Sequence, residues 1–505
     1  MANLFTMLQS TFRRRKLPAI LTVATSVALT ALIDDAAAKQ PRQEPLTESM
    51  APRDAGEPIM AIVSIKTQQV TFYDADGWIL RAPVSTGVKG RETPAGVFAV
   101  LQKDADHHSS LYDDAWMPHM QRLTWNGIAL HGGPLPGYAA SHGCVRMPFG
   151  FAEKLFDKTR IGMRVIVSPN DAAPAAFSHA ALLVPNAKAI AAAPARAEML
   201  DREAAEAAKV AEEAKKAAAT ASREATSNTA ALRKLEGLKA KAAAELASAD
   251  KTLAAAKTDQ AKANAEDAKL KATTKAADAG AKLDTAGVDA KSKLDLAASA
   301  TDAAKAAATR KADTAKAAKE AKLALEPVSI YISRATQKLY VRRNTHKAWA
   351  DGGEVFDTTI EVPVTIRDPD RPIGTHVFTA MAHDGAGLRW TAVTIDNGNE
   401  AKDALDRITI PQNVFDSVAP TALPRSSIVV SDEPLSRETN FRTEFVAVLS
   451  KQPQGGFITR QPTVEVAVAK NKSWGDSVFG FFDDQPTGNT RRRGGNYPVQ
   501  KDWWW

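Results

Sequence analysis

The residues best suited to chemistry lie in one short segment of the chain. His131 follows the apolar run Gly127-Ile128-Ala129-Leu130, and after a nine-residue spacer comes Ser141-His142-Gly143-Cys144, which holds the only cysteine among 505 residues. A thiol attacks carbonyl groups as a thiolate, and a nearby base or positive charge favours that form. Because two histidines lie within fourteen residues of Cys144, the segment predicts a cysteine-dependent acyl transferase or hydrolase.

The neighbours of Cys144 fit an acyl-transfer site better than a metal site. His131 is expected at a strand end, which fixes a base better than a free loop does. Gly143 lets the backbone turn and approach closely, so the amides of Gly143 and Cys144 are expected to face a developing oxyanion. Two histidines and a cysteine are also zinc ligands, but His142 and Cys144 are separated by one residue and no fourth ligand is evident. We therefore expect no metal and no cofactor.

The elements that must position these residues are predicted to be strands. Short alternating apolar runs separated by turn residues extend over residues 57–170, which indicates a mainly β domain. A helix is expected around residues 149–158, and a last strand at residues 163–167. The clearest runs are Ile62-Val63-Ser64-Ile65, Val70-Thr71-Phe72-Tyr73 and Gly96-Val97-Phe98-Ala99-Val100.

This region resembles the L,D-transpeptidase catalytic domain (YkuD type), whose hallmark is a histidine, a spacer and then Ser/Thr-His-Gly-Cys. Upstream, Val84-Ser85-Thr86-Gly87 and Thr93-Pro94-Ala95-Gly96-Val97-Phe98 look like the strand and loop that precede the active site in that family. The resemblance covers about residues 57–170, under a quarter of the chain. The spacer between His131 and Ser141 is shorter than the family's usual one, which leaves the substrate-covering loop and the choice of acceptor open.

The resemblance implies a role for each residue of the motif. Cys144 would be the nucleophile and His131 the general base, oriented by the Gly132 carbonyl. Arg146 would hold a substrate carboxylate, a task suited to a planar guanidinium. The residues implied to shape the pocket and the oxyanion site are Ser141, His142 and Gly143. The implied substrate is the tetrapeptide stem of peptidoglycan: Cys144 attacks the carbonyl of the third stem residue, expels the terminal D-alanine, and an amine or water opens the thioester.

Three functions remain open from the sequence. An L,D-transpeptidase would form cross-links or attach an envelope protein to stem peptides. A carboxypeptidase or endopeptidase would use water as the acceptor instead. A protein of a different class would span the envelope as a structural element and carry an auxiliary catalytic domain. The net charge of +7 is spread over every region without a dense basic and aromatic face, so we expect no nucleic-acid partner.

The N-terminal residues predict export. Arg13-Arg14-Arg15-Lys16 precedes the uncharged apolar run from Leu17 to Ile33, and the small residues Ala36-Ala37-Ala38 follow. This order is typical of a signal peptide, or of an uncleaved anchor, over residues 1–38. The polar residues 39–56 are expected to be a linker. The rest of the protein is then expected in the periplasm or cell envelope, with membrane contact only through the N-terminal segment.

The rest of the chain changes composition three times. Residues 171–194 are expected to be an Ala/Pro-rich linker. Residues 195–325, dominated by Ala, Lys, Glu, Asp and Thr, predict long helix. This helical or coiled-coil region is expected to form either an antiparallel hairpin broken near Gly280 and Gly287 or a partly helical spacer.

A second β-rich domain is predicted over residues 326–450. Thr336-Gln337-Lys338-Leu339 echoes Thr67-Gln68-Gln69-Val70, and the region has no cysteine, so it is expected to be a degenerate transpeptidase-like copy. The tail, residues 451–505, is expected to be disordered. The fold class predicted for the whole chain is mainly β, with a long Ala/Lys-rich helical insertion and a second β-rich domain.

Overall fold

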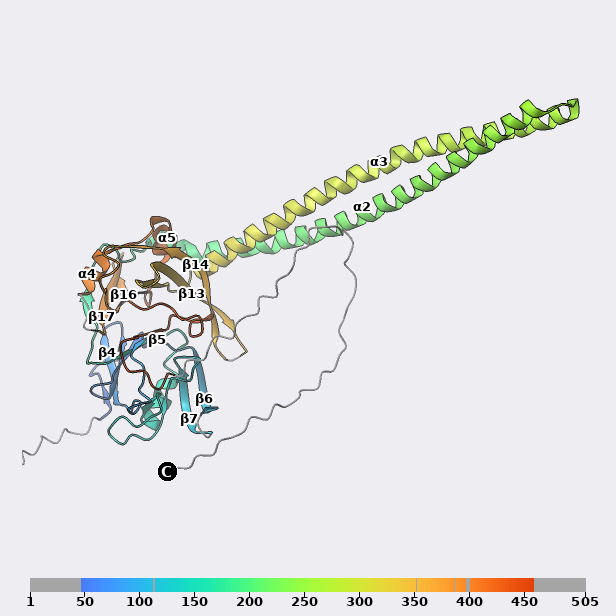
Figure 1. Ribbon diagram of the computed structural model, residues 1–505. Coiled ribbons are helices and arrows are strands. Elements are labelled where there is room, and N and C mark those ends of the chain that lie inside the picture. Colours follow the sequence, from blue (N-terminus) through green and yellow to red (C-terminus); the bar gives the residue numbers. More distant parts are fainter. Residues whose placement is uncertain (1–46, 112–113, 351, 386, 397–399, 458–505) are drawn as a thin grey trace, which may run out of the picture. The chain divides into compact units, whose positions relative to one another are not determined.

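The computed structural model describes residues 47–111, 114–350, 352–385, 387–396 and 400–457. It confirms the predicted fold class: an N-terminal β domain, a long helical insertion and a second β-rich domain (Figure 1). The predicted export segment 1–38 lies outside the described residues. No helix among the described residues combines the length and the apolarity that crossing a membrane requires.

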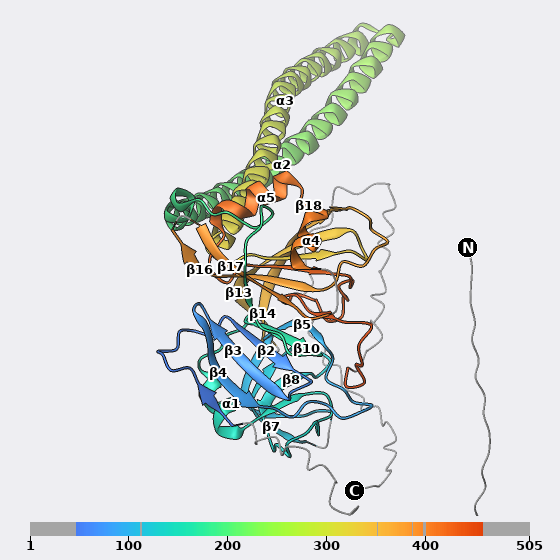
Figure 2. The same cartoon turned by 90° about the vertical axis from the view of Figure 1, so that its left-hand side faces the viewer.

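The main sheet of the N-terminal domain is buried on both faces because its central strands are almost wholly apolar. On β2 (Met60–Ser64), Ala61 and Val63 pack in the core beneath α1 (Phe149–Phe156), whereas Met60 and Ile62 pack with residues of the second β domain. Figure 2 shows the two β domains stacked along this contact. In sheet order, the strands are β1 (Ser49–Met50), β4 (Gly77–Pro83), β3 (Gln69–Asp74), β2, β10 (Arg164–Ser168), β5 (Gly96–Ala99) and β20 (Ala447–Val448).

A smaller four-stranded sheet in the same domain carries the motif residues. Its first three strands pair antiparallel, and the last pair, β8 with β9, is parallel. In sheet order the strands are β6 (Gln102–His108), β7 (Trp116–Arg122), β8 (Ala129–Gly132) and β9 (Val145–Met147).

The second β domain contains a seven-stranded sheet and a two-stranded one. The order of the large sheet is β11 (Ala175–Phe177), β17 (Gly387–Thr394), β16 (His376–Asp384), β19 (Ser427–Ser431), β12 (Ser329–Ser333), β13 (Lys338–Ala348) and β14 (Glu354–Pro363). The remaining elements are β15 (Thr365–Ile366) paired with β18 (Ile408–Thr409), α4 (Ala401–Asp406), α5 (Gln412–Val418) and the short 3₁₀ helix η1 (Ala419–Thr421). Because β11 joins this sheet, the predicted linker 171–194 is partly structured.

The strand pairing of the second domain matches that of the first. In the first domain β2 pairs antiparallel with β3 and parallel with β10, and β10 pairs antiparallel with β5. In the second domain β12 pairs antiparallel with β13 and parallel with β19, and β19 pairs antiparallel with β16. The turns after β2 and β12 also agree, since Gln68 and Gln337 have φ of 51° and 52°. In both turns the glutamine Nε2 donates to the carbonyl oxygen three residues earlier, at 2.7 Å. The echo seen in the sequence therefore corresponds to one turn geometry used twice.

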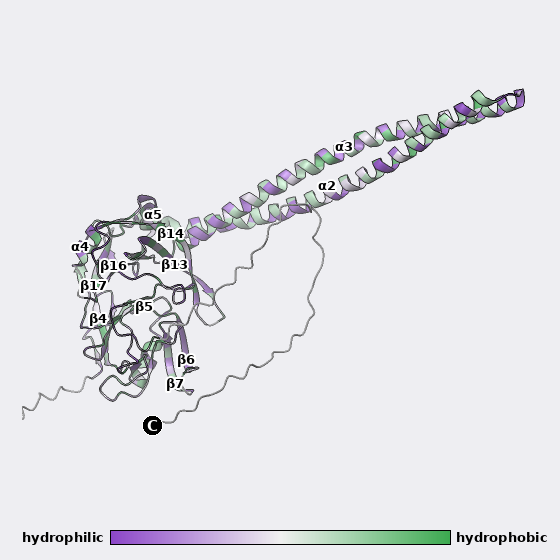
Figure 3. Cartoon of the chain, in the orientation of Figure 1, coloured by the Kyte–Doolittle hydropathy of each residue, from purple (hydrophilic) through white to green (hydrophobic). Residues whose placement is uncertain are grey.

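The helical insertion is a pair of long helices, α2 (Ala187–Ala255) and α3 (Asp259–Leu323) (Figure 1). Lys275–Glu245 joins the start of α3 to the end of α2, and Lys322–Asp201 joins the end of α3 to the start of α2. The two helices are therefore antiparallel. The side chains buried along them are alanines, apart from Thr314, and small side chains let helix backbones approach. Figure 3 shows apolar and polar residues interspersed along both helices, without a broad apolar face.

The boundaries of the helical region differ from those predicted. α2 begins at Ala187, where the Asn186 side chain accepts hydrogen bonds from the amides of residues 188 and 189, and not at residue 195. The predicted breaks at Gly280 and Gly287 are wrong, because both glycines lie inside α3. The reversal is at residues 256–258, and the Thr258 side chain caps α3.

Candidate active site

Two adjacent parallel strands bring His131 and Cys144 to the same face of the small sheet. β8 and β9 pair with Leu130 opposite Val145 and His131 opposite Arg146, and Cys144 immediately precedes β9. Alternate residues of a strand point to the same face, so Ala129 and His131 share one. Cys144 packs against Ala129 in a small apolar cluster, which places its thiol on the face that carries His131.

The His131 imidazole is held as a neutral base. Its Nδ1 lies 2.9 Å from the Gly132 carbonyl oxygen; because a carbonyl only accepts, Nδ1 carries the hydrogen and Nε2 is left unprotonated. The side chain is 7% exposed. Burial lowers the pKa of His131 to about 4, and the positive charge of Arg146 lowers it too. The hydrogen bond to the Gly132 carbonyl opposes this effect and raises the pKa. The predicted pairing of His131 with the Gly132 carbonyl is thus present in the structure.

The Cys144 thiol rests in its protonated form. Its Sγ lies 3.2 Å from the Gly127 carbonyl oxygen, to which it donates. Burial raises the pKa of Cys144 to about 11, although the Ala129 backbone and the charges of Arg122 and Arg146 oppose the rise. Among the described residues no hydrogen bond joins Sγ to the imidazole. A neutral thiol beside a neutral imidazole requires that the proton move when substrate is bound.

The loop before Cys144 is fixed by a chain of hydroxyl contacts. Ser141 Oγ donates to the Cys144 carbonyl oxygen at 2.5 Å and accepts from the Gly143 amide at 3.1 Å. Thr93 Oγ1 donates to the Gly143 carbonyl at 2.8 Å and accepts from the Gly87 amide. Gly143 has φ of 122°, a conformation that side chains disfavour. The Gly143 amide thus bonds Ser141 in this arrangement, and its oxyanion role stays a prediction.

Arg146 brings positive charge to the site, whereas His142, whose pKa is lowered, is neutral at pH 7. Arg146 is half-buried on β9, and its stem packs against Gly133. Its charge lowers the pKa of both His131 and His142. For His142 partial burial is the larger cause, and Arg91 adds to it. His142 itself is exposed, so it lies at the rim of the site.

Arg122 is a residue near Cys144 that the sequence did not single out. It lies on β7, where its Nε donates to Gln102 Oε1 at 2.5 Å and its Nη2 lies 3.3 Å from His107 Nε2. Its charge favours the Cys144 thiolate. Thr93, the first residue of the Thr93-Pro94-Ala95-Gly96 segment, joins Gly87 to Gly143 through its hydroxyl. No short-range pattern marks Arg122, because its effect on Cys144 arises from pairing between β7 and β8.

The chain after β20, residues 449–457, runs back over the catalytic loop, and we call it the C-terminal strap. The amides of Gly455 and Gly456 donate to the Glu92 side chain and carbonyl, at 3.1 and 2.9 Å. Phe457 packs against the core of the N-terminal domain. The predicted disordered tail is thus ordered up to residue 457, and the rest of it lies outside the described residues. The strap lies beside Gly143, the residue before Cys144.

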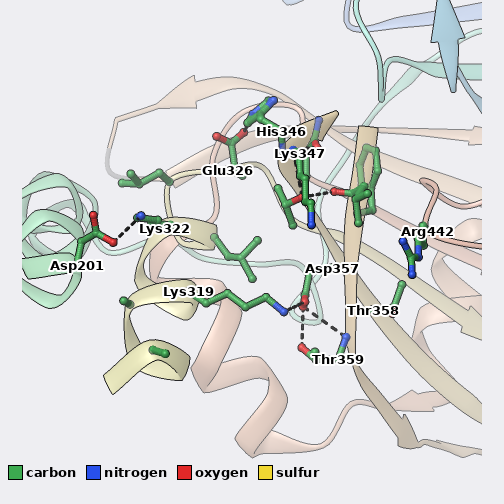
Figure 4. Close-up of a pocket in the computed structure, with 18 of the residues that line it drawn as sticks. Asp201, Lys319, Lys322, Glu326, His346, Lys347, Asp357, Thr358, Thr359 and Arg442 are labelled. Carbon is green, nitrogen blue, oxygen red and sulfur yellow. Dashed lines mark hydrogen bonds and ion pairs between the residues drawn. The ribbon is translucent and has the colours of Figure 1, made fainter. Parts of the chain in front are cut away.

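A large cavity of about 820 Å³ lies elsewhere, at the base of the helical hairpin (Figure 4). Its charged groups bind one another: Lys319 donates to Asp357, which also accepts from Thr359, and Lys322 pairs with Asp201. Neither Cys144 nor His131 lines it. Within the part of the chain that the structure describes, no three histidine, cysteine, aspartate or glutamate side chains gather as a metal site.

His131 lies on β8 and Cys144 lies immediately before the parallel strand β9, so the structure brings the two predicted site residues to neighbouring positions of one sheet. Residues 58–167 match the model of the YkuD family, the L,D-transpeptidase catalytic domain. This match confirms the resemblance predicted for about residues 57–170.

Solved L,D-transpeptidase structures are similar to the same part of the chain. The enzyme from Stackebrandtia nassauensis is 25% identical over 23% of this chain and 58% of its own, with a TM-score of 0.21. The enzyme from Xylanimonas cellulosilytica is 26% identical over 23% of this chain and 63% of its own, with a TM-score of 0.21. The enzyme from Mycobacterium smegmatis is 23% identical over 22% of this chain and 59% of its own, also with a TM-score of 0.21. The match thus spans less than two thirds of each of those chains. A comparison with curated proteins gave no match.

Proposed function

We propose that the protein is an L,D-transpeptidase that acts on peptidoglycan stem peptides through a thioester on Cys144. The observation that carries the proposal is the arrangement of β8 and β9, which places the Cys144 thiol on the His131 face while the Gly132 carbonyl leaves His131 Nε2 free of a proton. A base of this kind can take the proton of a thiol whose own pKa is too high for spontaneous ionisation.

In the proposed acylation, His131 Nε2 accepts the thiol proton while Sγ forms a bond to the carbonyl carbon of the third stem residue. The carbonyl electrons move to oxygen, and the Cys144 amide donates to the oxyanion, since the Gly143 amide bonds Ser141. When the oxyanion collapses, the bond to the terminal D-alanine breaks and His131 protonates the departing amine. Arg146 binds a carboxylate of the donor stem.

The proposal extends to the other parts of the chain. Residues 1–38 export the protein, cleaved or retained as an anchor, so that it works in the periplasm or cell envelope. The second β domain is a copy of the transpeptidase fold without a nucleophile, since it repeats the strand pairing and has no cysteine. The helical hairpin, as an antiparallel coiled coil, then acts as a spacer toward an envelope partner, such as a protein acceptor.

The test is intact-mass spectrometry of the purified protein incubated with a disaccharide-tetrapeptide and, separately, with a carbapenem. We expect a covalent adduct on the wild type that is absent from Cys144→Ala. Product masses from the first incubation distinguish a cross-linked dimer from a tripeptide trimmed by water. Folded protein with a reduced thiol that forms no adduct with either reagent would overturn the proposal in favour of a structural role.

A further inference from the structure

Two exposed aromatic residues stack on one another close to the strand that carries His131. Trp116 is the first residue of β7 and Phe149 the first of α1. Their ring centres are 6.0 Å apart, and the ring planes differ by 24°. The two residues are 55% and 48% exposed. We call them the aromatic pair. Large apolar groups that gather on a surface often mark a binding site, so the pair is a candidate for one.

A hydrogen bond holds the Trp116 ring in position. Its Nε1 donates to Asp106 Oδ1 at 2.8 Å. Asp106 lies on β6 opposite Pro118, and alternate residues of a strand share a face, so Trp116, Pro118 and Asp106 lie on one side of the small sheet. Asp106 is exposed, and a carboxylate accepts several hydrogen bonds. The aromatic pair therefore has a hydrogen-bond acceptor at its edge that can also bind a ligand hydroxyl.

The aromatic pair lies at the end of the small sheet where β8 finishes. A Cβ atom added to Gly132, the last residue of β8, would be 3.2 Å from both Phe149 Cδ1 and Pro118 Cγ. Neighbouring residues of a strand point to opposite faces, so Gly132 faces away from the side that carries His131 and the Cys144 thiol. A ligand that contacts both the thiol and the aromatic pair must therefore pass around this end of the sheet.

Arg146 and Gly133 lie along the route between the thiol and the aromatic pair. Arg146 is opposite His131 on β9, and a Cβ added to Gly133 would be 3.2 Å from its Cγ and Cδ atoms. Phe149 follows Cys144 by five positions, which span at most about 17 Å in an extended chain. The order along this route is thiol, guanidinium, glycine and aromatic pair.

A peptidoglycan stem presents its groups in the same order. The carbonyl attacked by Cys144 belongs to the third stem residue, carboxylates precede it, and the first stem residue is linked to an amino sugar. Three extended residues span about 10 Å, and the linking group and the sugar ring add several ångströms. When the carbonyl is at Cys144 and a carboxylate at Arg146, an extended stem can therefore bring the sugar to the aromatic pair.

We propose that the aromatic pair binds the amino sugar that carries the donor stem, with the sugar ring on Trp116 and a hydroxyl group on Asp106. The faces of a pyranose ring present C–H bonds, which are attracted to the negative face of an aromatic ring, and its edge presents hydroxyl groups. The inference rests on the proposed function and adds to it a preference for stems attached to glycan over free stem peptides.

The experiment compares two donors that differ only in the sugar, a disaccharide-tetrapeptide and the free tetrapeptide. Product masses over time give kcat/KM for each donor with the purified wild type, Trp116→Leu and Phe149→Ala. We expect wild type to prefer the disaccharide donor about tenfold, as burial of one sugar face provides. Both variants should lose most of this preference. They should cleave the free tetrapeptide, and react with a carbapenem at Cys144, at wild-type rates.

Two further variants separate stacking from other effects. Trp116→Phe keeps an aromatic ring without the bond to Asp106, so it should retain part of the preference. Phe441→Ala, which removes an exposed aromatic side chain of the second domain, is the matched control and should behave as wild type.

Three results would contradict the proposal. No preference in wild type, or a wild-type preference in Trp116→Leu, would overturn the sugar site alone. An equal fall in the cleavage of both donors by Trp116→Leu and Phe149→Ala would show that the rings support the fold, and would also overturn it. Absence of cleavage of either donor and of any adduct on wild-type Cys144 would overturn the proposed function together with the sugar site.

Discussion

Gly143 and Gly456 lie with their backbones in direct contact, although 313 positions separate them in the sequence. A Cβ atom added to Gly143 would be 2.9 Å from the Gly456 Cα, and one added to Gly456 would be 2.6 Å from the Gly143 Cα. Real Cβ atoms essentially never approach this closely. The C-terminal strap therefore contacts the residue before Cys144 only because both positions are glycine.

This contact lies close to the end of the short spacer between His131 and Ser141. The spacer ends at Ser141, and the strap contacts Gly143 two residues later. Gly455 is similarly close to residues 90 and 92, where a Cβ would be 2.4 Å from the Gly90 carbonyl oxygen. We therefore expect the strap to affect access to Cys144, because it packs against the loop that precedes this residue.

Gly456→Val is expected to displace the strap. The new side chain would have to push against the backbone of Gly143 and the Glu92 carbonyl, which are not flexible side-chain ends. We expect faster proteolytic cleavage within residues 449–457 and at least a tenfold slower acylation of Cys144 by a carbapenem. Gly150→Ala is the control, since nothing lies within 4 Å of its Cβ and the residue is exposed in α1; it should stabilise the helix slightly, by about 0.5–1 kcal/mol. Unchanged proteolysis and acylation in Gly456→Val would contradict the role of the strap.

The thiol of the free enzyme is expected to alkylate slowly at neutral pH. Because burial raises the pKa of Cys144 to about 11, the thiolate fraction should grow about tenfold per pH unit from pH 7 to 10. Iodoacetamide labelling followed by mass spectrometry measures this rate. Arg122→Gln should slow labelling further at each pH, because it removes a positive charge that favours the thiolate. A rate that reaches a plateau near pH 7 would show a preformed thiolate and contradict the neutral resting pair.

His131 is expected to make stability depend on pH in the acidic range. Its folded pKa is about 4 and its ordinary value 6.5, so the unfolded chain binds more protons between these values. The native state therefore loses stability as pH falls from 6.5 toward 4, by about 2 kcal/mol at pH 5. Thermal unfolding from pH 7 to 4.5 should show a smaller acid loss in His131→Gln than in wild type. Equal losses in the two proteins would refute the assignment.

Local sequence patterns predicted the parts of this molecule whose structure is set by near neighbours. The motif around Cys144 works through adjacent strands, and the turn at Gln337 repeats that at Gln68 because each glutamine bonds a carbonyl three residues away. The strap could not be found in this way. Gly455 and Gly456 have no local reason to be glycine, since the atoms that exclude a Cβ belong to residues 90–92 and 143.

The helical hairpin shows the same division. A glycine inside a helix costs about 1 kcal/mol relative to alanine, so Gly280 and Gly287 indicated breaks. However, α3 continues through both glycines, supported by antiparallel packing and by ion pairs such as Lys293–Glu224. The turn is instead at a capping threonine, Thr258, followed by an acidic residue in the first turn. Caps and dipole charges indicate where a helix starts, and here they were better guides than glycine.

The two β domains are expected to depend on a buried ion pair between Arg164 and Glu444. Arg164 Nη2 lies 3.4 Å from Glu444 Oε1, both side chains are 5% exposed, and Arg164 also donates to Ser427 of the second domain. Arg164→Met would leave the buried carboxylate without this partner, which typically costs about 3–5 kcal/mol. We expect a clear fall in the thermal unfolding midpoint, recovered in part by adding Glu444→Gln. Arg389→Met removes an exposed contact between the same domains, with Asp76, and should cost less than about 1 kcal/mol. Equal effects of the two arginine variants would show that burial of the Arg164 pair does not hold the domains together.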